Sequence, residues 1–176
     1  MRLFRLTDPQ FAVSDDIRDH AKGSHKVSGR WHDLQYMLSE GGLLYTSASA
    51  SMSSAEKQVH ATQEQLRNHE FALITYEATL DPDLTTILPA AALPAGWDDP
   101  LGCEPCTRAG SDWYQEGTSV FLIVPSVTLP ATVYDPDPLD TMRNGNVLVN
   151  TRHPHAADLI RKVDVTPFRY DKRLAP

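Results

Sequence analysis

The longest uninterrupted apolar run in this chain of 176 residues lies near residues 120–124, V-F-L-I-V, and is followed by Pro125 and Ser126. A continuous apolar run of this length predicts a strand that is covered on both of its faces. It is much shorter than the roughly 20 residues that a bilayer-spanning helix needs. The sequence therefore predicts a protein that does not span a membrane and whose sheet has other elements packed against it.

Further strands are predicted where apolar residues alternate or cluster between turn residues, at 3–6, 43–46, 71–80, 84–88, 133–134, 146–150 and 163–170. Helical segments are predicted at 15–22, 53–69 and 153–160, with a helical turn at 110–114. Strands and helices do not alternate as a βαβ series, which favours an α+β layer architecture. The length is that of one domain, so we expect residues 1–176 to form a single domain.

The strongest helix signal begins at Ser53. Ser53 and Glu56 have the S-x-x-E spacing of a capping box, in which the glutamate side chain reaches back to the start of the helix. Four residues then fall on one stripe at helical spacing, namely Ala55, Val59, Thr62 and Leu66. We expect this stripe to pack on a sheet, with Glu56 at its edge.

The charge balance disfavours nucleic-acid binding. The formal net charge is −7, and the sequence has no run of five like charges and no basic stripe. The N-terminus reads as a strand and lacks the apolar run and small-residue cleavage site of a signal peptide. We expect a cytoplasmic protein with no direct contact to nucleic acid or membrane.

The two cysteines form the motif C-E-P-C at Cys103 and Cys106. A structural zinc site needs four ligands, and the chain has no second cysteine pair. A redox pair is expected at the start of a helix, whereas this motif follows a long connection rich in proline and glycine, 89–106. We therefore interpret the two cysteines as incidental residues of a loop.

Several polar residues have both a structural and a chemical interpretation. Arg30, between Gly29 and Trp31, is either a salt-bridged surface residue or a planar fork for a pyrophosphate. Tyr45 either packs in the core or stacks on an aromatic cation. Arg5 either points outward or contacts phosphate or ribose, and Ser126 either forms a turn or bonds a ligand.

Several short motifs, in order along most of the chain, resemble the RES domain, the toxin half of RES-Xre toxin–antitoxin pairs. They are G-R-W at 29–31, L-Y-T-S at 44–47, A-E-x-x-V-H at 55–60, G-x-x-W at 110–113, V-P-S at 124–126, N-V-L-V-N-x-x-H-P at 146–154 and P-F-R-Y-D-x-R-L at 167–174. The chain departs from the family pattern at His32, where asparagine is usual, and in the segment D-L-Q-Y-M-L-S-E that follows it.

The resemblance implies an ADP-ribosyltransferase-like fold and an enzyme that cleaves the nicotinamide–ribosyl bond of its substrate NAD⁺ without a metal, arresting growth. Residue matching carries over Arg5, Arg30, Tyr45, Glu56 and Ser126. Glu56 would stabilise the ribosyl cation, as a carboxylate does in glycoside hydrolysis. The resemblance also implies an Xre-type helix-turn-helix antitoxin that blocks the active site, and it allows a homodimer within that complex. Transfer of ADP-ribose to a protein, and a silent antitoxin-binding module, are the alternatives. Asn150 and His153 stay outside the predicted site.

Overall fold

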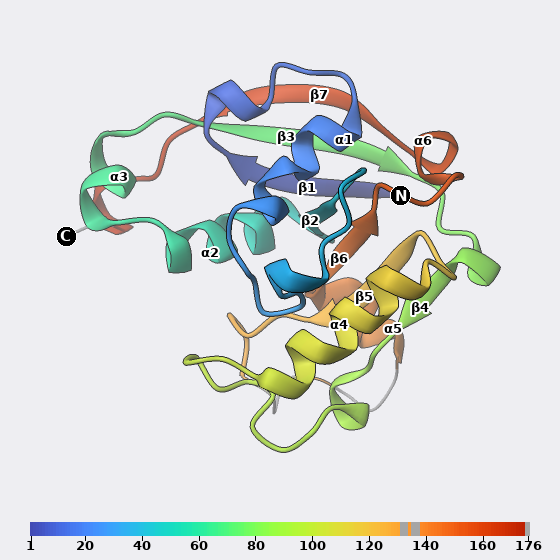
Figure 1. The fold of residues 1–176 in the computed structure, drawn as a ribbon. Coiled ribbons are helices and arrows are strands. Elements are labelled where there is room, and N and C mark those ends of the chain that lie inside the picture. The colour runs from blue at the N-terminus through green and yellow to red at the C-terminus, as the bar shows by residue number, and fades with distance from the viewer. Residues whose placement is uncertain (131–133, 135–137, 175–176) are drawn as a thin grey trace.

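The computed structural model describes residues 1–130, 134 and 138–174, with only the backbone of 138–140 and of Leu174. Its strands form one mixed sheet in the order β4-β5-β6-β2-β1-β3-β7 (Figure 1). Their bounds are β1 Arg2–Thr7, β2 Leu43–Ser47, β3 Phe71–Ala78, β4 Thr85–Ile87, β5 Phe121–Pro125, β6 Gly145–Asn150 and β7 Ile160–Phe168. β4 pairs with β5 in parallel, and the other neighbours in this order are antiparallel. The predicted strands are confirmed with shifts of a few residues, except 133–134, where Val133 lies outside the described residues.

Helices flank the sheet, so the α+β prediction is confirmed (Figure 1). They are α1 Ile17–Ala21, α2 Ala50–His60, α3 Gln63–Asn68, α4 Glu104–Glu116, α5 Pro138–Asn144 and α6 Ala156–Leu159. α1 and α6 are shorter than predicted, whereas α4 is a helix of 13 residues where only one turn was expected. No helix within residues 1–130 or 138–174 has the length and apolar character that crossing a bilayer requires.

The buried apolar run in β5 joins two parts of the core. Phe121 and Ile123 belong to one buried cluster, whereas Leu122 and Val124 belong to another that includes Trp113 of α4. Successive strand residues point to opposite faces of a sheet, so this alternation places packed side chains on both faces. The prediction of a strand covered on both sides is confirmed.

The prediction of one helix over 53–69 with a capping box at Ser53 and Glu56 is wrong. α2 begins earlier, at an N-cap formed by Ser49, whose hydroxyl accepts a hydrogen bond from the Met52 amide at 3.1 Å. The chain is extended at Ala61, and Thr62 and Gln65 form a capping box that starts α3. The segment therefore has a capping box, but at residues that were not predicted, and Glu56 takes no part in it.

The predicted stripe on this helix is wrong for the same reason. Val59 is 64% exposed, and only Leu66 of the four stripe residues is buried. The face of α2 that meets the sheet carries Met52 and Ser53 instead. The Ser53 hydroxyl accepts a hydrogen bond of 2.7 Å from the amide of Leu6 in β1, which fixes α2 against that strand.

The interpretation of the cysteines as incidental loop residues is also wrong. Cys103 is the N-cap residue of α4, and its sulfur is joined to that of Cys106 in a disulfide. Pro105 lies in the first turn of α4, where its missing N–H costs little. The proline that suggested a loop is therefore part of a helix start.

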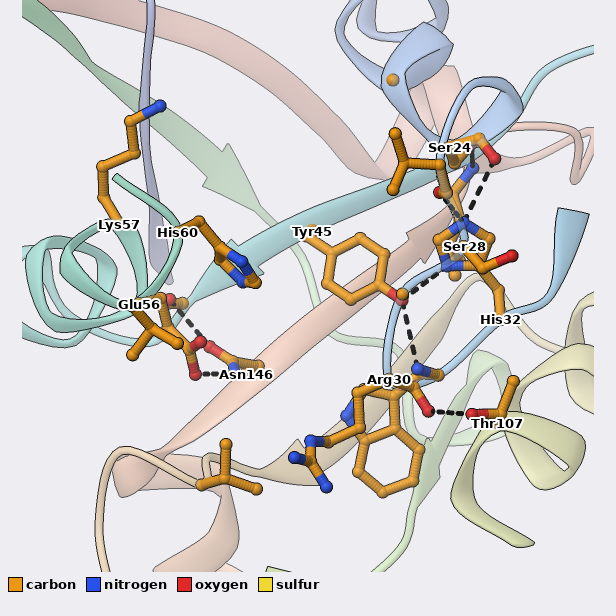
Figure 2. Close-up of a pocket in the computed structure, with 18 of the residues that line it drawn as sticks. Ser24, Ser28, Arg30, His32, Tyr45, Glu56, Lys57, His60, Thr107 and Asn146 are labelled. Atoms are coloured by element: carbon orange, nitrogen blue, oxygen red, sulfur yellow. Dashed lines mark hydrogen bonds between the residues drawn. The ribbon is translucent and has the colours of Figure 1, made fainter. Parts of the chain in front are cut away.

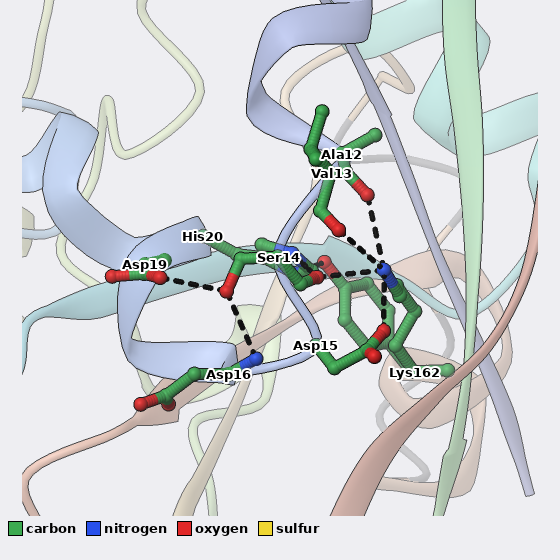
Figure 3. A network of polar contacts seen from close by, with 9 residues as sticks. Ala12, Val13, Ser14, Asp15, Asp16, Asp19, His20 and Lys162 are labelled. Atoms are coloured by element: carbon green, nitrogen blue, oxygen red, sulfur yellow. Dashed lines mark hydrogen bonds and ion pairs between the residues drawn. The ribbon is translucent and has the colours of Figure 1, made fainter.

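A polar network fixes the segment that leads into α1 (Figure 3). The ammonium group of Lys162 in β7 donates to the carbonyls of Ala12, Val13 and Ser14, at 3.1, 3.3 and 2.7 Å. It also pairs with the Asp15 carboxylate at 2.7 Å. This network ties the N-terminal loop to the far edge of the sheet and so positions α1 and the residues that follow it.

Candidate active site

A cavity of about 710 Å³ opens between the N-terminal part of the sheet and the α4 region. Its wall is built from β1, β2, α2, the segment before β2, the segment before α4, and the first residues of β6. Small-molecule sites in proteins have volumes of this order. Arg5, Arg30, Tyr45 and Glu56 all line it, and Figure 2 shows Tyr45 between Glu56 on one side and Arg30 on the other.

Glu56 projects from α2 and has one oxygen tied to the sheet. Its Oε1 accepts hydrogen bonds from the Ser126 hydroxyl, at 2.6 Å, and from the side-chain amide of Asn146. Figure 2 shows Glu56 and Asn146 side by side. The side-chain oxygen of Asn146 in turn accepts a hydrogen bond of 2.8 Å from the Ser47 hydroxyl. These two residues lie opposite each other on β2 and β6. Oε2 of Glu56 has no hydrogen-bond donor in the part of the chain that the structure describes. The carboxylate is thus oriented at one oxygen and open at the other.

Ser126 lies behind Glu56, not on the cavity wall. The residue is fully buried. Its hydroxyl donates to Glu56, and it accepts from the Thr128 amide at 3.1 Å. The predicted ligand contact of Ser126 stays a prediction. In the arrangement observed, this serine orients the carboxylate.

Arg30 lies at the tip of a very tight loop. Gly29 and His32 exchange two backbone hydrogen bonds of 3.0 and 3.3 Å, so only Arg30 and Trp31 lie between them. Two residues of α4 hold this loop. The Thr107 hydroxyl donates to the Arg30 carbonyl at 2.9 Å, and Gly110 packs against the Trp31 backbone. A Cβ at position 110 would lie 2.1 Å from the Trp31 oxygen, which explains why a glycine is needed in the middle of this helix.

The guanidinium of Arg30 is engaged with the segment before α4. Nη1 donates to the Trp97 carbonyl at 2.8 Å and Nη2 to the Asp99 carbonyl at 2.7 Å. Both acceptors are uncharged backbone oxygens. Charge-assisted bonds to a phosphate are stronger than bonds to a carbonyl, so the fork can exchange these partners for an anionic ligand.

Tyr45 stands in the middle of the cavity. Its hydroxyl lies 2.7 Å from Nδ1 of His32 and accepts a hydrogen bond of 3.3 Å from the Trp31 amide. Burial raises the pKa of Tyr45, so the hydroxyl stays protonated at neutral pH. The ring is therefore fixed at its outer end by polar contacts, and its face is available to a ligand.

Arg5 projects from β1 beneath Tyr45, and its Nη1 donates to the Tyr45 carbonyl at 3.3 Å. Burial lowers the pKa of Arg5, but a guanidinium remains protonated at neutral pH even so. Arg5 and Arg30 thus give the cavity two guanidinium groups, against the carboxylate of Glu56, whereas the ammonium group of Lys57 lies 3.4 Å from the Asp8 carboxylate. In a chain with a net charge of −7, this local excess of positive charge favours an anionic ligand.

Asn146, Ser47 and His32 complete the site, although the sequence predicted no role for them. Asn146 and Ser47 each stand in a family motif, and it is the register of β2 and β6 that places them opposite each other. Asn150, at the other end of β6, is buried and donates to the Tyr114 carbonyl at 3.2 Å, away from the residues that line the cavity. No group of three or more His, Cys, Asp or Glu side chains within residues 1–130, 134 and 141–173 is arranged to hold a metal ion.

Comparison with known proteins supports the resemblance seen in the sequence. The family model of the RES domain matches residues 2–171. The chain is 26% identical over 174 residues to "Toxin Res" of Photorhabdus laumondii subsp. laumondii, which covers 99% of this chain and 97% of the relative. It is 26% identical over 175 residues to the "Prs ADP-ribosylating toxin" of Sphingobium sp., covering 96% and 92%. A "Toxin Res" of Yersinia enterocolitica is 24% identical over 174 residues, with 99% of both chains covered. The chain therefore belongs to the RES domain family, and its α+β fold is ADP-ribosyltransferase-like.

Proposed function

We propose that this protein is the toxin of a type II toxin–antitoxin system and that it cleaves the nicotinamide–ribosyl bond of NAD⁺. The observation that carries the proposal is the way in which the Glu56 carboxylate is held. One of its oxygens is held by Ser126 and Asn146, and the other faces a cavity that also contains Arg30 and Tyr45. A carboxylate held in this way is suited to a ribose on which positive charge develops.

In the proposed reaction no side chain of the protein forms a covalent bond with the substrate. As the bond between ribose C1′ and the pyridinium nitrogen breaks, its electron pair goes to that nitrogen and neutral nicotinamide leaves. Oε2 of Glu56 would accept hydrogen bonds from the ribose hydroxyls and stabilise the oxocarbenium-like sugar. Water or inorganic phosphate then bonds to C1′ and loses a proton to solvent. The products are nicotinamide with ADP-ribose, or with its 1″-phosphate.

The remaining cavity residues would bind the rest of the molecule. Tyr45 offers a ring face to the pyridinium, a contact worth roughly 0.5–2 kcal/mol. Arg30 would turn from the carbonyls of Trp97 and Asp99 to the pyrophosphate, and Arg5 would contribute a second positive charge. NAD⁺ is thus the substrate of the proposed reaction, and the reaction as proposed uses no metal.

The test is nicotinamide release from NAD⁺ by purified protein that is free of its antitoxin, measured by chromatography with and without phosphate. Glu56→Gln is expected to lower the rate by about 10²–10³-fold. The glutamine keeps an oxygen that can accept from Ser126 and Asn146, so the fold should persist. Glu64→Gln, on the exposed face of α3, is the matched control and should leave the rate unchanged. No nicotinamide release by the wild type under either condition would contradict the proposal.

A second function, transfer of ADP-ribose to a protein, is favoured by the relative named as an ADP-ribosylating toxin. The same bond breaks, but a nucleophilic side chain of the target takes the place of water. Labelled NAD⁺ incubated with cell lysate separates the two functions, since only transfer leaves label on a protein. A third alternative is a silent module that only binds the antitoxin. Unchanged growth on expression of both the wild type and Glu56→Ala would support it.

We also propose that a cytoplasmic helix-turn-helix antitoxin of the Xre type blocks the cavity, with a toxin homodimer as one arrangement of the complex. Three apolar side chains at the mouth of the cavity support this, because Val27, Val59 and Leu101 are 69%, 64% and 96% exposed. Exposed apolar groups around a pocket are typical of interaction surfaces. Coexpression of a helix-turn-helix protein encoded beside the toxin gene is expected to restore growth, and Leu101→Asp to weaken that rescue.

A further inference from the structure

His32 has both ring nitrogens in hydrogen bonds, and their partners define its protonation. The residue is buried, and Nε2 lies 3.1 Å from the carbonyl oxygens of both Ser24 and Val27. A carbonyl oxygen can only accept, so Nε2 carries the proton. Burial lowers the pKa of His32, which favours the neutral ring and leaves Nδ1 as an acceptor.

The neutral ring determines the orientation of the Tyr45 hydroxyl. Nδ1 of His32 lies 2.7 Å from that hydroxyl and, having no proton, must accept its O–H. The tyrosine oxygen in turn accepts from the Trp31 amide. The only proton of the hydroxyl is thus directed at His32, and the ring cannot swing without breaking both bonds.

Gly29 leaves the space for this contact. A Cβ at position 29 would lie 2.8 Å from the Tyr45 hydroxyl and 3.0 Å from two atoms of the His32 ring. The tight loop that carries Arg30 therefore packs directly against the histidine–tyrosine pair. The three observations describe one unit, shown on the right of Figure 2, in which the loop, His32 and Tyr45 fix one another.

We propose that His32 is the positioning residue for Tyr45. Through Nδ1 it holds the tyrosine as a rigid wall whose face, and not its hydroxyl, meets the ligand. This proposal rests on the proposed function. In this proposal His32 keeps Tyr45 in place, and Tyr45 binds a flat, electron-poor ring such as the pyridinium of NAD⁺. Glu56 acts in the cleavage step. Loss of the Nδ1 contact should therefore raise KM for NAD⁺ and leave kcat nearly unchanged.

Two substitutions separate positioning from a purely structural role. His32→Gln places an amide near Nε2, where it can still donate to the carbonyls of Ser24 and Val27, but it leaves Tyr45 without an acceptor. His32→Asn places an amide oxygen near Nδ1, where it can accept from Tyr45, but it leaves the two carbonyls without a donor. We expect His32→Gln to lower Tm less than His32→Asn does, because one hydroxyl and not two carbonyls loses its partner, and to raise KM by about tenfold. We expect His32→Asn to lower Tm and to keep a KM within about twofold of the wild type.

A structural role would give another pattern, in which KM rises most in the variant whose Tm falls most. That result, or a fall in kcat with unchanged KM in His32→Gln, would overturn the proposal. A second measurement does not depend on activity. ¹⁵N-histidine NMR should show His32 with its proton on Nε2, and Tyr45→Phe should shift the Nδ1 resonance because the hydrogen bond is lost. A proton on Nδ1 would refute the proposal, whereas a wild type that releases no nicotinamide but shows the expected NMR pattern would refute only the proposed function.

Discussion

Glu56 shows how the orientation of one side chain depends on its neighbours. The side-chain amide of Asn146 and the Ser126 hydroxyl both donate to Oε1. Asn146→Asp would replace the amide by a second carboxylate. An ionised carboxylate cannot donate, so Oε1 would lose one of these two donors and face a like charge.

This gives a prediction for the rate of nicotinamide release. Loss of one hydrogen bond to the carboxylate, together with like-charge repulsion, should turn Glu56 away from its observed position, and we expect Asn146→Asp to lower kcat by about 10–10²-fold at neutral pH. The measurement is nicotinamide release by the purified variant under the conditions used for the wild type. Asn68→Asp, on the exposed surface of α3, adds the same charge elsewhere and should leave kcat unchanged. An equal loss in both variants would mean that net charge, and not the contact with Glu56, is responsible.

At the scale of elements, α2 shows where local sequence signals reach their limit. Serines stand at 49, 51, 53 and 54, and S-x-x-E spacing selects Ser53 because Glu56 follows it. The choice of Ser49 as the N-cap is made by tertiary structure, because the amide of Leu6 in β1 needs an acceptor and Ser53 supplies it. The strands were predicted well because alternation and apolar runs depend on burial itself, which the sheet then provides.

The corrected roles of Ser53 and Thr62 can be measured by chemical denaturation. Ser53→Ala leaves the buried amide of Leu6 without a partner, and we expect a loss of about 1–3 kcal/mol in the free energy of unfolding. Thr62→Ala removes one half of the capping box of α3 and should cost about 1 kcal/mol. Nicotinamide release by Thr62→Ala should be unchanged. No loss of stability in Ser53→Ala would contradict the role of Ser53 as the partner of the Leu6 amide.

α4 was underestimated for a related reason. Proline and glycine lower helix propensity, so Pro105 and Gly110 left only one turn in the prediction. In the structure the proline occupies the first turn and the glycine lets the helix approach the Trp31 backbone. The candidate site could be predicted in part, because Arg30, Tyr45 and Glu56 belong to short motifs. Asn146 also belongs to a motif, but its contact with Glu56 depends on the register between distant strands.

Gly110→Ala tests this close approach. Helix propensity alone would stabilise the variant by about 1 kcal/mol, whereas a Cβ at 2.1 Å from the Trp31 oxygen must push the Arg30 loop away. We expect the clash to dominate, with a net loss of about 1–3 kcal/mol and a higher KM for NAD⁺. Gly23→Ala is the control, because nothing lies within 4 Å of the added methyl group. A more stable Gly110→Ala variant would contradict the packing described for α4.

At the scale of the whole molecule, the same histidine–tyrosine arrangement occurs twice. His20 lies in the network of Figure 3, with Nε2 at 2.9 Å from the Ser14 carbonyl and Nδ1 at 2.7 Å from the Tyr76 hydroxyl. His32 repeats the pattern with two carbonyls and Tyr45. One pair lies at the β7 side of the sheet and the other in the cavity. In both pairs the histidine ring must be neutral. The stability of the fold and the order of the cavity therefore depend on the same protonation state of histidine.

The consequence is a loss of stability in mild acid. Burial lowers the pKa of both His20 and His32 below the ordinary value near 6.5, so the unfolded chain binds protons more readily than the folded protein. The stabilising effect is fully present above the unfolded pKa and is lost as the pH falls from there through the folded values. Tm should therefore decrease between pH 7 and pH 5, and the free energy of unfolding should fall by at most about 1.4 kcal/mol per pH unit for each of the two histidines. His32→Gln removes one of these two buried rings and should make the decrease shallower, whereas His155→Gln, at an exposed position, should not. A pH dependence that is identical in all three proteins would rule out the buried histidine as its source.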